Sequence, residues 1–376
     1  MAGIYIHIPF CKQACHYCDF HFSTSLKHKD GMLQALAKEL QLRKSELEGK
    51  IIETIYFGGG TPSVLSNAEI ELLIAAVYAN FKVIENPEIT LEANPDDLSV
   101  DRIVALAATP INRLSIGVQS FLDKDLKLMN RAHDAKEAMH VLTTAVQYFP
   151  NTSLDLIYGI PNQTDAEWQQ NIKRALDFGV PHISSYALTV EPKTALEKFI
   201  SKGLVPKIDD EQAQRQFMLL VDTLEQADFI NYEISNFGKK DYFSKNNTAY
   251  WLGKSYLGIG PSAHSFNGVN RGWNVRNNQK YIKAIQEEQL PIEIETLTTR
   301  DRYNEYIMTG LRTIWGVSLI RLKEEFGERY KKYALQQAEK YVEEHLLFLE
   351  DNVLRTTKKG KFLADGIASD LFMINL

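Results

Sequence analysis

Length, composition and charge limit what this chain can be. Its 376 residues are enough for one barrel of roughly 250 residues plus an appended domain. The 42 basic and 48 acidic side chains give a net charge of −6, which argues against a broad nucleic-acid surface. No apolar run reaches the roughly 18 residues of a membrane span, and we expect a cytoplasmic protein with reduced thiols.

The first part of the chain predicts strands that alternate with helices. Short apolar runs predict six strands, at 3–8, 51–57, 88–92, 113–117, 153–158 and 182–188. Amphipathic stretches predict helices near 30–47, 67–81, 100–108, 135–149, 166–178 and 212–225. Ser66 with Glu69, and Thr164 with Glu167, have the spacing of capping boxes. This alternation is typical of a mostly parallel sheet, and in an α/β barrel the reactive groups gather where the strands end.

The only three cysteines follow the first predicted strand with the spacing CxxxCxxC, as Cys11, Cys15 and Cys18. Three thiolates from one loop can ligate three irons of a 4Fe-4S cluster and leave the fourth iron open for chemistry. A Cys3His zinc site and buried thiols without a metal are the alternatives. The fourth zinc ligand would come from His7, His16 or His21. The odd number of cysteines argues against a disulfide framework.

Glycines and polar residues lie where other predicted strands end. A triple glycine, Gly58 to Gly60, precedes Thr61 and lets backbone groups approach a ligand closely. Glu92 ends the third predicted strand, Gln119 follows the fourth, and Asp155 lies within the fifth. S-adenosylmethionine (SAM) has an ammonium, a carboxylate and a ribose diol. Glu92 can accept from the ammonium or a hydroxyl, Gln119 and Asp155 can bind the diol, and Arg131 can pair with the carboxylate.

The amino-acid composition of the sequence changes near residue 241. Residues 241–278 are rich in Asn, Gly and aromatic side chains and predict ordered loops wrapped over the barrel mouth. Helices are then predicted at 300–312, 318–326 and 329–349, followed by a strand at 353–356 and a basic turn at 358–361. We therefore divide the chain into a partial barrel (1–240), an aromatic, Asn- and Gly-rich segment over the mouth (241–296) and a helical, winged-helix-like domain (297–376).

Together these motifs resemble those of radical SAM proteins, and more closely the family of oxygen-independent coproporphyrinogen III oxidases and HemW heme chaperones. The resemblance covers nearly the whole chain. It rests on YIHIPFC (5–11), CHYCDF (15–20), YFGGGTPS (56–63), EANP (92–95), SIGVQSF (115–121), NRAH (130–133), DLIYGIPNQT (155–164) and YEISNF (232–237). It implies a partial (β/α)6 barrel of TIM type with a C-terminal domain like that of HemN.

The resemblance also implies the ligands of two cofactors. Cys11, Cys15 and Cys18 would hold the 4Fe-4S cluster. The SAM site would be lined by Tyr5, Tyr17, Gly59, Gly60, Thr61, Glu92, Gln119, Arg131, Asp155 and the backbone at Ala187.

Two departures from the family pattern bear on function. The decarboxylating members extend the cysteine motif to CxxxCxxCxC, but the last position here is Phe20, which argues against porphyrinogen decarboxylation. HemW proteins also carry an HNxxYW signature associated with heme. The matching residues here are Asn246, Asn247, Tyr250 and Trp251. Because an amide is a poorer iron ligand than imidazole, His264 or Tyr250 could ligate heme instead of Asn246.

The resemblance favours a heme chaperone that delivers heme to heme-dependent respiratory proteins. Its cofactors would be a 4Fe-4S cluster and SAM, with heme as cargo, and its partners the heme acceptors and a flavodoxin or ferredoxin as electron donor. The resemblance is also compatible with a transient contact with membrane proteins. The protein would be a monomer or a cluster-dependent dimer. The alternative is a radical enzyme that acts on a porphyrinogen. A nucleic-acid-binding regulator that uses the basic turn is a third hypothesis, which net acidity disfavours.

Overall fold

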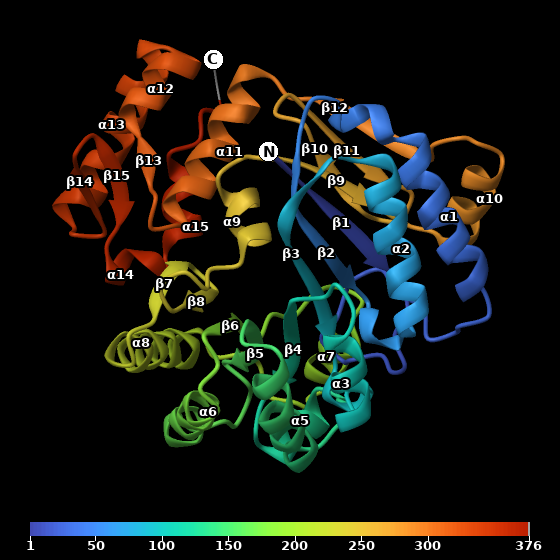
Figure 1. The fold of residues 1–376 in the computed structure, drawn as a ribbon. Coiled ribbons are helices and arrows are strands. Elements are labelled where there is room, and N and C mark those ends of the chain that lie inside the picture. The colour runs from blue at the N-terminus through green and yellow to red at the C-terminus, as the bar shows by residue number, and fades with distance from the viewer. Residues whose placement is uncertain (375–376) are drawn as a thin grey trace.

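Six parallel strands form the centre of the fold (Figure 1). The computed structural model describes residues 1–374. The strands follow one another in chain order as β1 (Ala2–Ile8), β2 (Ile52–Gly59), β3 (Val83–Ala93), β4 (Arg113–Gln119), β5 (Thr152–Tyr158) and β6 (His182–Ala187). β1 pairs with β9 on its other side and β6 with β8, so the sheet stays open. The expected partial (β/α)6 barrel is confirmed.

Helices cover the outside of this sheet. They are α1 (Lys29–Leu42), α2 (Asn67–Asn80), α3 (Val100–Ala107), α5 (Ala135–Tyr148), α6 (Asp165–Asp177) and α8 (Asp210–Gln226). Both predicted capping boxes are present, at Ser66 and Thr164. Between helices and sheet lies a continuous apolar core that includes Ile4, Phe57 and Trp168. Two short helices, α4 (Asp123–Leu128) and α7 (Ala195–Ser201), were not predicted, because so few turns show no clear period.

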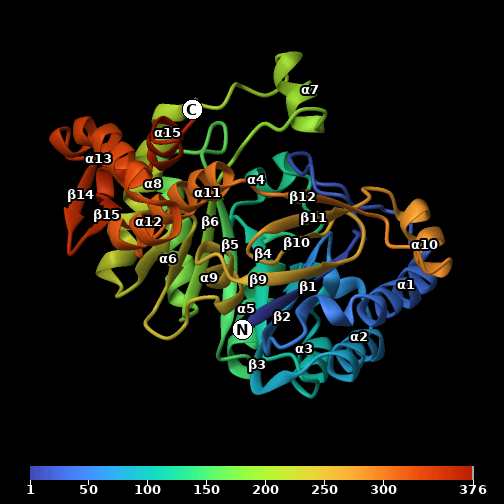
Figure 2. The ribbon, with the colours of Figure 1, turned by 90° about the horizontal axis from the view of Figure 1, so that it is seen from above.

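Residues 241–296 form two helices and an extension of the sheet, so the expectation of ordered loops over 241–278 was wrong. They contain α9 (Lys245–Trp251), β9 (Ser255–Ile259), β10 (His264–Phe266), β11 (Asn270–Asn274), α10 (Asn278–Gln286) and β12 (Ile292–Thr296). β9 pairs in parallel with β1, and β10 to β12 continue the sheet in antiparallel order (Figure 2). An unpaired edge at β1 would expose backbone groups, and these short strands cover it. Gly260, Asn267 and Gly268 lie in the turns between them.

At the opposite edge, β7 (Ile230–Glu233) and β8 (Asn236–Gly238) form a hairpin that pairs with β6. The C-terminal domain follows, with α11 (Thr299–Leu311), β13 (Val317–Ser318), α12 (Leu319–Phe326), α13 (Glu328–Glu343), β14 (Leu347–Glu350), β15 (Val353–Thr356), α14 (Lys358–Lys361) and α15 (Ala364–Asp370). Its helices and a three-stranded sheet enclose a core of their own. Helices beside a small antiparallel sheet agree with the expected winged-helix-like architecture.

The basic turn of this domain contacts the barrel. Lys358 forms ion pairs with Asp222 and Glu225 of α8, and Lys361 Nζ donates to the Asn231 carbonyl oxygen over 2.7 Å. Burial lowers the pKa of Lys361 to about 8. These lysines are therefore engaged in domain contacts, which removes the main feature that suggested nucleic-acid binding.

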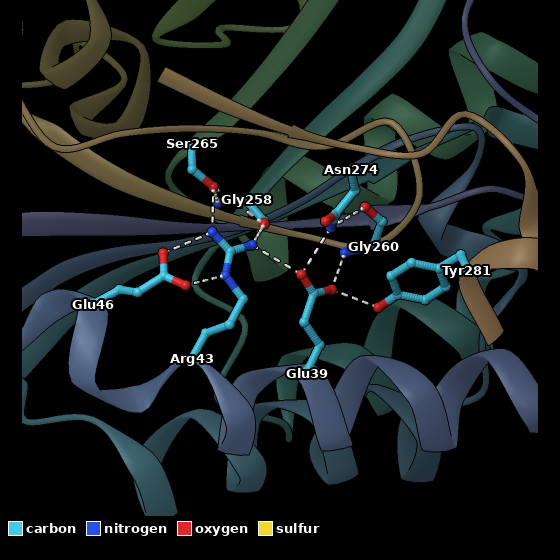
Figure 3. Close-up of polar contacts among 8 residues, drawn as sticks. All are labelled: Glu39, Arg43, Glu46, Gly258, Gly260, Ser265, Asn274 and Tyr281. Carbon is cyan, nitrogen blue, oxygen red and sulfur yellow. Dashed lines mark hydrogen bonds and ion pairs between the residues drawn. The ribbon is translucent and has the colours of Figure 1, made fainter. Parts of the chain in front are cut away.

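A buried ionic network joins α1 to the sheet extension (Figure 3). Arg43, at the end of α1, donates from Nη1 to Glu39 Oε1 over 2.9 Å and to the Gly258 carbonyl over 2.8 Å. Glu39 also accepts from Tyr281 Oη, Asn274 Nδ2 and the Gly260 amide. Both charged side chains are fully buried. The network fixes β9 to β11 against the element that follows the cysteine loop.

Among residues 1–374, no helix has both the length and the apolar character needed to cross a membrane.

Candidate functional site

The cysteine loop joins β1 to α1 and is anchored at several backbone positions. Its start pairs with its end through the Cys11 amide and the Ser23 carbonyl, 3.1 Å apart. Its middle is bound to the segment after α4: the His16 amide donates to the Met129 carbonyl, and Asn130 Nδ2 donates to the Ala14 carbonyl over 2.8 Å. Cys11 is buried and the other two cysteines are half-buried, all three as free thiols. These hydrogen bonds hold the backbone of the cysteine loop in a defined conformation.

The three histidines proposed as zinc ligands are engaged elsewhere. His7 Nε2 lies 2.9 Å from the His21 carbonyl, His16 Nδ1 lies 2.8 Å from the Leu128 carbonyl, and His21 Nε2 lies 2.6 Å from Asn278 Oδ1. Among residues 1–374, no three His, Cys, Asp or Glu side chains converge as the ligands of a single ion do. A four-iron cluster makes a different demand, because each thiolate binds a different iron. The thiol set fits a cluster better than zinc.

Burial disfavours the charged form of two of the cysteines. It raises the pKa of Cys11 to about 11, opposed by a hydrogen bond from Thr61, and raises the pKa of Cys18 to about 11 as well. Arg131 Nη1 donates to Cys15 Sγ over 3.4 Å. Because a metal ligand must be deprotonated, cluster binding at this loop would release protons.

The triple glycine lies directly against the cysteine loop. The Gly60 amide donates to the Ile8 carbonyl over 2.9 Å, and the Thr61 amide donates to the Phe10 carbonyl over 2.7 Å. A Cβ at Gly60 would lie 2.6 Å from the Phe10 oxygen, closer than a side chain can stand. Gly59 has φ +108° and carries the His7 ring against it. Only glycine permits this approach, so the motif places bare backbone beside the cysteines.

Two carboxylates lie on neighbouring parts of the sheet, Glu92 near the end of β3 and Asp155 in the middle of β5. Glu92 accepts from Tyr56 Oη over 2.7 Å and from the Gly59 amide over 3.3 Å. Burial, reinforced by the nearby charge of Asp155, raises the pKa of Glu92 to about 7. Burial raises the pKa of Asp155 to about 6, although Ser115 Oγ donates to its Oδ1 over 3.2 Å. Two carboxylates with raised pKa values are well placed to accept from a cationic or hydroxylated ligand.

Arg131 connects these groups to the cysteine loop. Its Nη2 donates over 2.7 Å to both Asn94 Oδ1 and the Gly117 carbonyl, and its buried Nε has no partner among residues 1–374. Gln119, with φ +67°, lies beside Gly117. The guanidinium thus uses three N–H groups in contacts with protein, and its buried Nε is one donor left for a ligand carboxylate.

The remaining predicted SAM residues surround the same mouth. The Tyr5 ring stacks on Tyr56 with centroids 6.0 Å apart, and its hydroxyl lies 3.2 Å from His7 Nδ1. Burial raises the pKa of Tyr17, whose ring lies near Arg131 and Cys15. Ala187 ends β6. The structure therefore gathers the predicted cysteines, glycines and carboxylates at the carboxyl end of the barrel strands.

Sequence reasoning assigned no role to two residues that hold this site together. Asn94 accepts from Arg131 and donates from Nδ2 to Thr61 Oγ1 over 3.4 Å. Tyr56 fixes Glu92 through its hydroxyl. Both lie inside motifs, EANP and YFGGGTPS, so their positions were visible although their contacts were not.

Four of the five residues considered for heme lie on α9, while His264 lies on β10. Asn246 is buried near the starts of β1 to β3, away from the cysteines, where its Oδ1 accepts from Thr54 Oγ1 over 3.1 Å and its amide donates to Glu88 Oε1. Ser244 caps the same helix, because its Oγ accepts from the backbone amide of Asn247. His264 is exposed on β10 opposite Trp273.

Tyr250 and Trp251, by contrast, line a cavity of about 500 Å³ between the sheet extension and the C-terminal domain. Asn246, Asn247 and His264 are outside that lining. The end of α9, rather than its start, therefore borders a space that could hold a ligand.

Comparisons with known proteins agree with these features. Residues 5–175 match the model of the radical SAM superfamily, and residues 297–363 match that of the HemN C-terminal domain. The heme chaperone HemW of Bacillus subtilis is 34% identical over 98% of both chains. HemW of Mycobacterium tuberculosis is 32% identical over 98% of this chain and 94% of its own.

A mitochondrial protein of Bos taurus, radical S-adenosyl methionine domain-containing protein 1, is 31% identical over 98% of this chain and 86% of its own. Among solved structures, coproporphyrinogen III oxidase (HemN) of Escherichia coli superposes with a TM-score of 0.86 over 99% of this chain and 90% of its own. Its identity is 24%, so this likeness concerns the fold.

Proposed function

Because the chain belongs to the HemW family of radical SAM proteins, we propose that it is a cytoplasmic heme chaperone, which binds heme as cargo and transfers it to heme-dependent respiratory proteins. The observation that carries this proposal is the similarity to heme chaperones along nearly the whole chain. Phe20 supports it, because the extra thiol of the decarboxylating enzymes is replaced there by an exposed phenyl ring.

The radical SAM family implies a 4Fe-4S cluster and SAM. Cys11, Cys15 and Cys18 would hold the cluster, and with SAM it would supply one-electron chemistry. The protein's own residues would orient SAM and balance the charges of its ammonium and carboxylate. Glu92 would accept from the SAM ammonium or ribose, Asp155 from the ribose, and Arg131 Nε would donate to the carboxylate.

Further SAM contacts would come from Tyr5, Tyr17, Gly59, Gly60, Thr61, Gln119 and the backbone at Ala187. A flavodoxin or ferredoxin would supply electrons to a cluster at this mouth.

A heme titration tests the proposal. The protein, reconstituted with iron and sulfide under anaerobic conditions, would be mixed with hemin, desalted and read at the Soret band. We expect about one heme retained per chain, and transfer of that heme to a heme-free acceptor protein. A parallel incubation with coproporphyrinogen, SAM and a reductant provides the contrast. A decarboxylated product without heme retention would overturn the chaperone proposal in favour of the radical enzyme.

A further inference from the structure

The cavity beside Tyr250 and Trp251 has two aromatic walls from different parts of the chain. Its volume, about 500 Å³, is in the range of small-molecule sites. One wall comes from α9 and the sheet extension and includes Tyr256 and Phe266. The other comes from the C-terminal domain and includes Tyr306 and Phe326. Such walls suit a broad, flat apolar ligand that contacts both faces.

Three arginines border the same cavity, and they differ in their partners. Arg271 pairs with Glu305, and Arg321 Nε donates to Glu325 Oε1 over 2.8 Å while its guanidinium lies over the Tyr306 ring. Arg302 is half-buried, has no hydrogen bond or ion pair from its side chain among residues 1–374, and its Nε is fully shielded from solvent. A guanidinium whose Nε–H is shielded from water without a hydrogen-bond partner is costly, and an anionic ligand would offset that cost.

We propose that this cavity is the heme cargo site and that Arg302 of the C-terminal domain pairs with a heme propionate. Heme combines a flat apolar macrocycle with two carboxylates on one edge, which matches aromatic walls with an unpaired guanidinium at their border. The inference rests on the proposed chaperone function. It adds that the C-terminal domain forms half of the cargo site and that Asn246 lies outside it.

Two ligands and three variants test the inference in the full-length protein. Hemin and hemin dimethyl ester, whose propionates are uncharged, would be titrated into wild type, Arg302→Gln, Arg302→Lys and the control Arg329→Gln. Arg329 is exposed on α13 and outside the cavity lining. We expect Arg302→Gln to weaken hemin binding by ~10- to 100-fold, as loss of a charge-assisted bond predicts. Arg302→Lys should recover part of the loss and Arg329→Gln should match wild type. The ester should bind wild type and Arg302→Gln equally.

The outcomes separate the two proposals. If wild type retains hemin but Arg302→Gln binds it equally well, the cavity assignment fails and the chaperone function stands. If wild type retains no hemin, the chaperone proposal itself fails. Circular dichroism would reveal whether Arg302→Gln folds. If it does not, the affinities of wild type for hemin and for its ester still test the role of a propionate. Equal affinity for the two ligands would overturn the role of a propionate.

Discussion

Arg131 Nη1 lies 3.4 Å from Cys15 Sγ, while Nη2 of the same guanidinium holds Asn94 and the Gly117 carbonyl. One side chain thus ties the cysteine loop to the ends of β3 and β4. Because the same guanidinium also holds Asn94 and the Gly117 carbonyl, Arg131 fixes the position of Cys15 relative to the strands and places a positive charge beside its sulfur.

Replacing Arg131 should therefore impair cluster assembly. In Arg131→Met, Cys15 Sγ loses its charged donor and Asn94 loses its partner, so we expect less iron per chain after reconstitution and SAM affinity at least ~10-fold weaker. Iron and sulfide analysis and equilibrium dialysis would measure both. Arg174→Met is the matched control, since Arg174 donates to the Phe121 carbonyl away from the cysteines. A variant with full iron content and normal SAM affinity would refute the dual role.

Cluster and heme should load independently. No cysteine lines the proposed heme cavity, and distant sites usually act additively. Cys15→Ala should lose the cluster, seen as loss of iron and sulfide, yet keep hemin affinity within about 2-fold of wild type. A Soret titration of the cluster-free variant measures this. A large loss of hemin affinity would show that the cysteine loop contributes to the cargo site.

SAM affinity should rise with pH through the ionisation of Glu92. Burial raises the pKa of Glu92 to about 7 from an ordinary value of 4.5, so the carboxylate that would attract the ammonium forms only as the pH passes 7. The same shift means that Glu92 contributes stability to the free protein below pH 4.5, and that this contribution is lost as the pH rises through 7. We expect the affinity for SAM to increase between pH 6 and pH 8, and isothermal titration calorimetry would measure it.

Glu92→Gln should flatten the pH dependence of SAM affinity and that of the stability of the free protein. Glu71→Gln, at an exposed position on α2, should leave both unchanged. The pKa of Asp155, about 6, would leave some dependence at lower pH. Identical pH profiles for wild type and Glu92→Gln would rule out Glu92 as the titrating group.

The buried Arg43–Glu39 pair should dominate the stability of the sheet extension. Arg43→Met leaves the Glu39 carboxylate buried without its counter-charge, and breaking such a pair costs about 3–5 kcal/mol. The midpoint of urea unfolding should fall accordingly. Lys38→Met removes an exposed ion pair of the same helix with Glu288 and should cost about 1 kcal/mol or less. Equal effects of the two substitutions would contradict the assigned importance of burial.

The central barrel could be predicted from the sequence because its signals are local. Alternating apolar runs and the capping boxes at Ser66 and Thr164 act within a few residues, and all six strands are present. The cysteine, glycine and carboxylate positions could be placed together because parallel strands end at one mouth. Contacts such as Tyr56 with Glu92 depend on side-chain packing across two strands, which no local pattern encodes.

The sheet extension and the cavity could not be predicted in this way. Strands β9 to β12 are short, and they form because β1, more than 240 residues earlier, offers a free edge. The cavity needs Phe266 and Arg302 to face one another from two domains. From the sequence, Lys358 suggested a nucleic-acid surface. In the structure it pairs instead with two carboxylates of α8.

Restoring the family histidine at position 246 should not restore a heme ligand. Asn246 is buried between Thr54 and Glu88 and lies outside the cavity lining, so an imidazole there would replace the Thr54 contact within a closely packed space. We expect Asn246→His to leave hemin affinity within about 2-fold of wild type and to lower stability by about 1–3 kcal/mol. Soret titration and urea unfolding would measure the two effects. Asn247→His, at a half-buried position on the same helix, is the control. A shift of the Soret band with tighter binding in Asn246→His alone would place the iron near the start of α9 and move the cargo site away from Arg302.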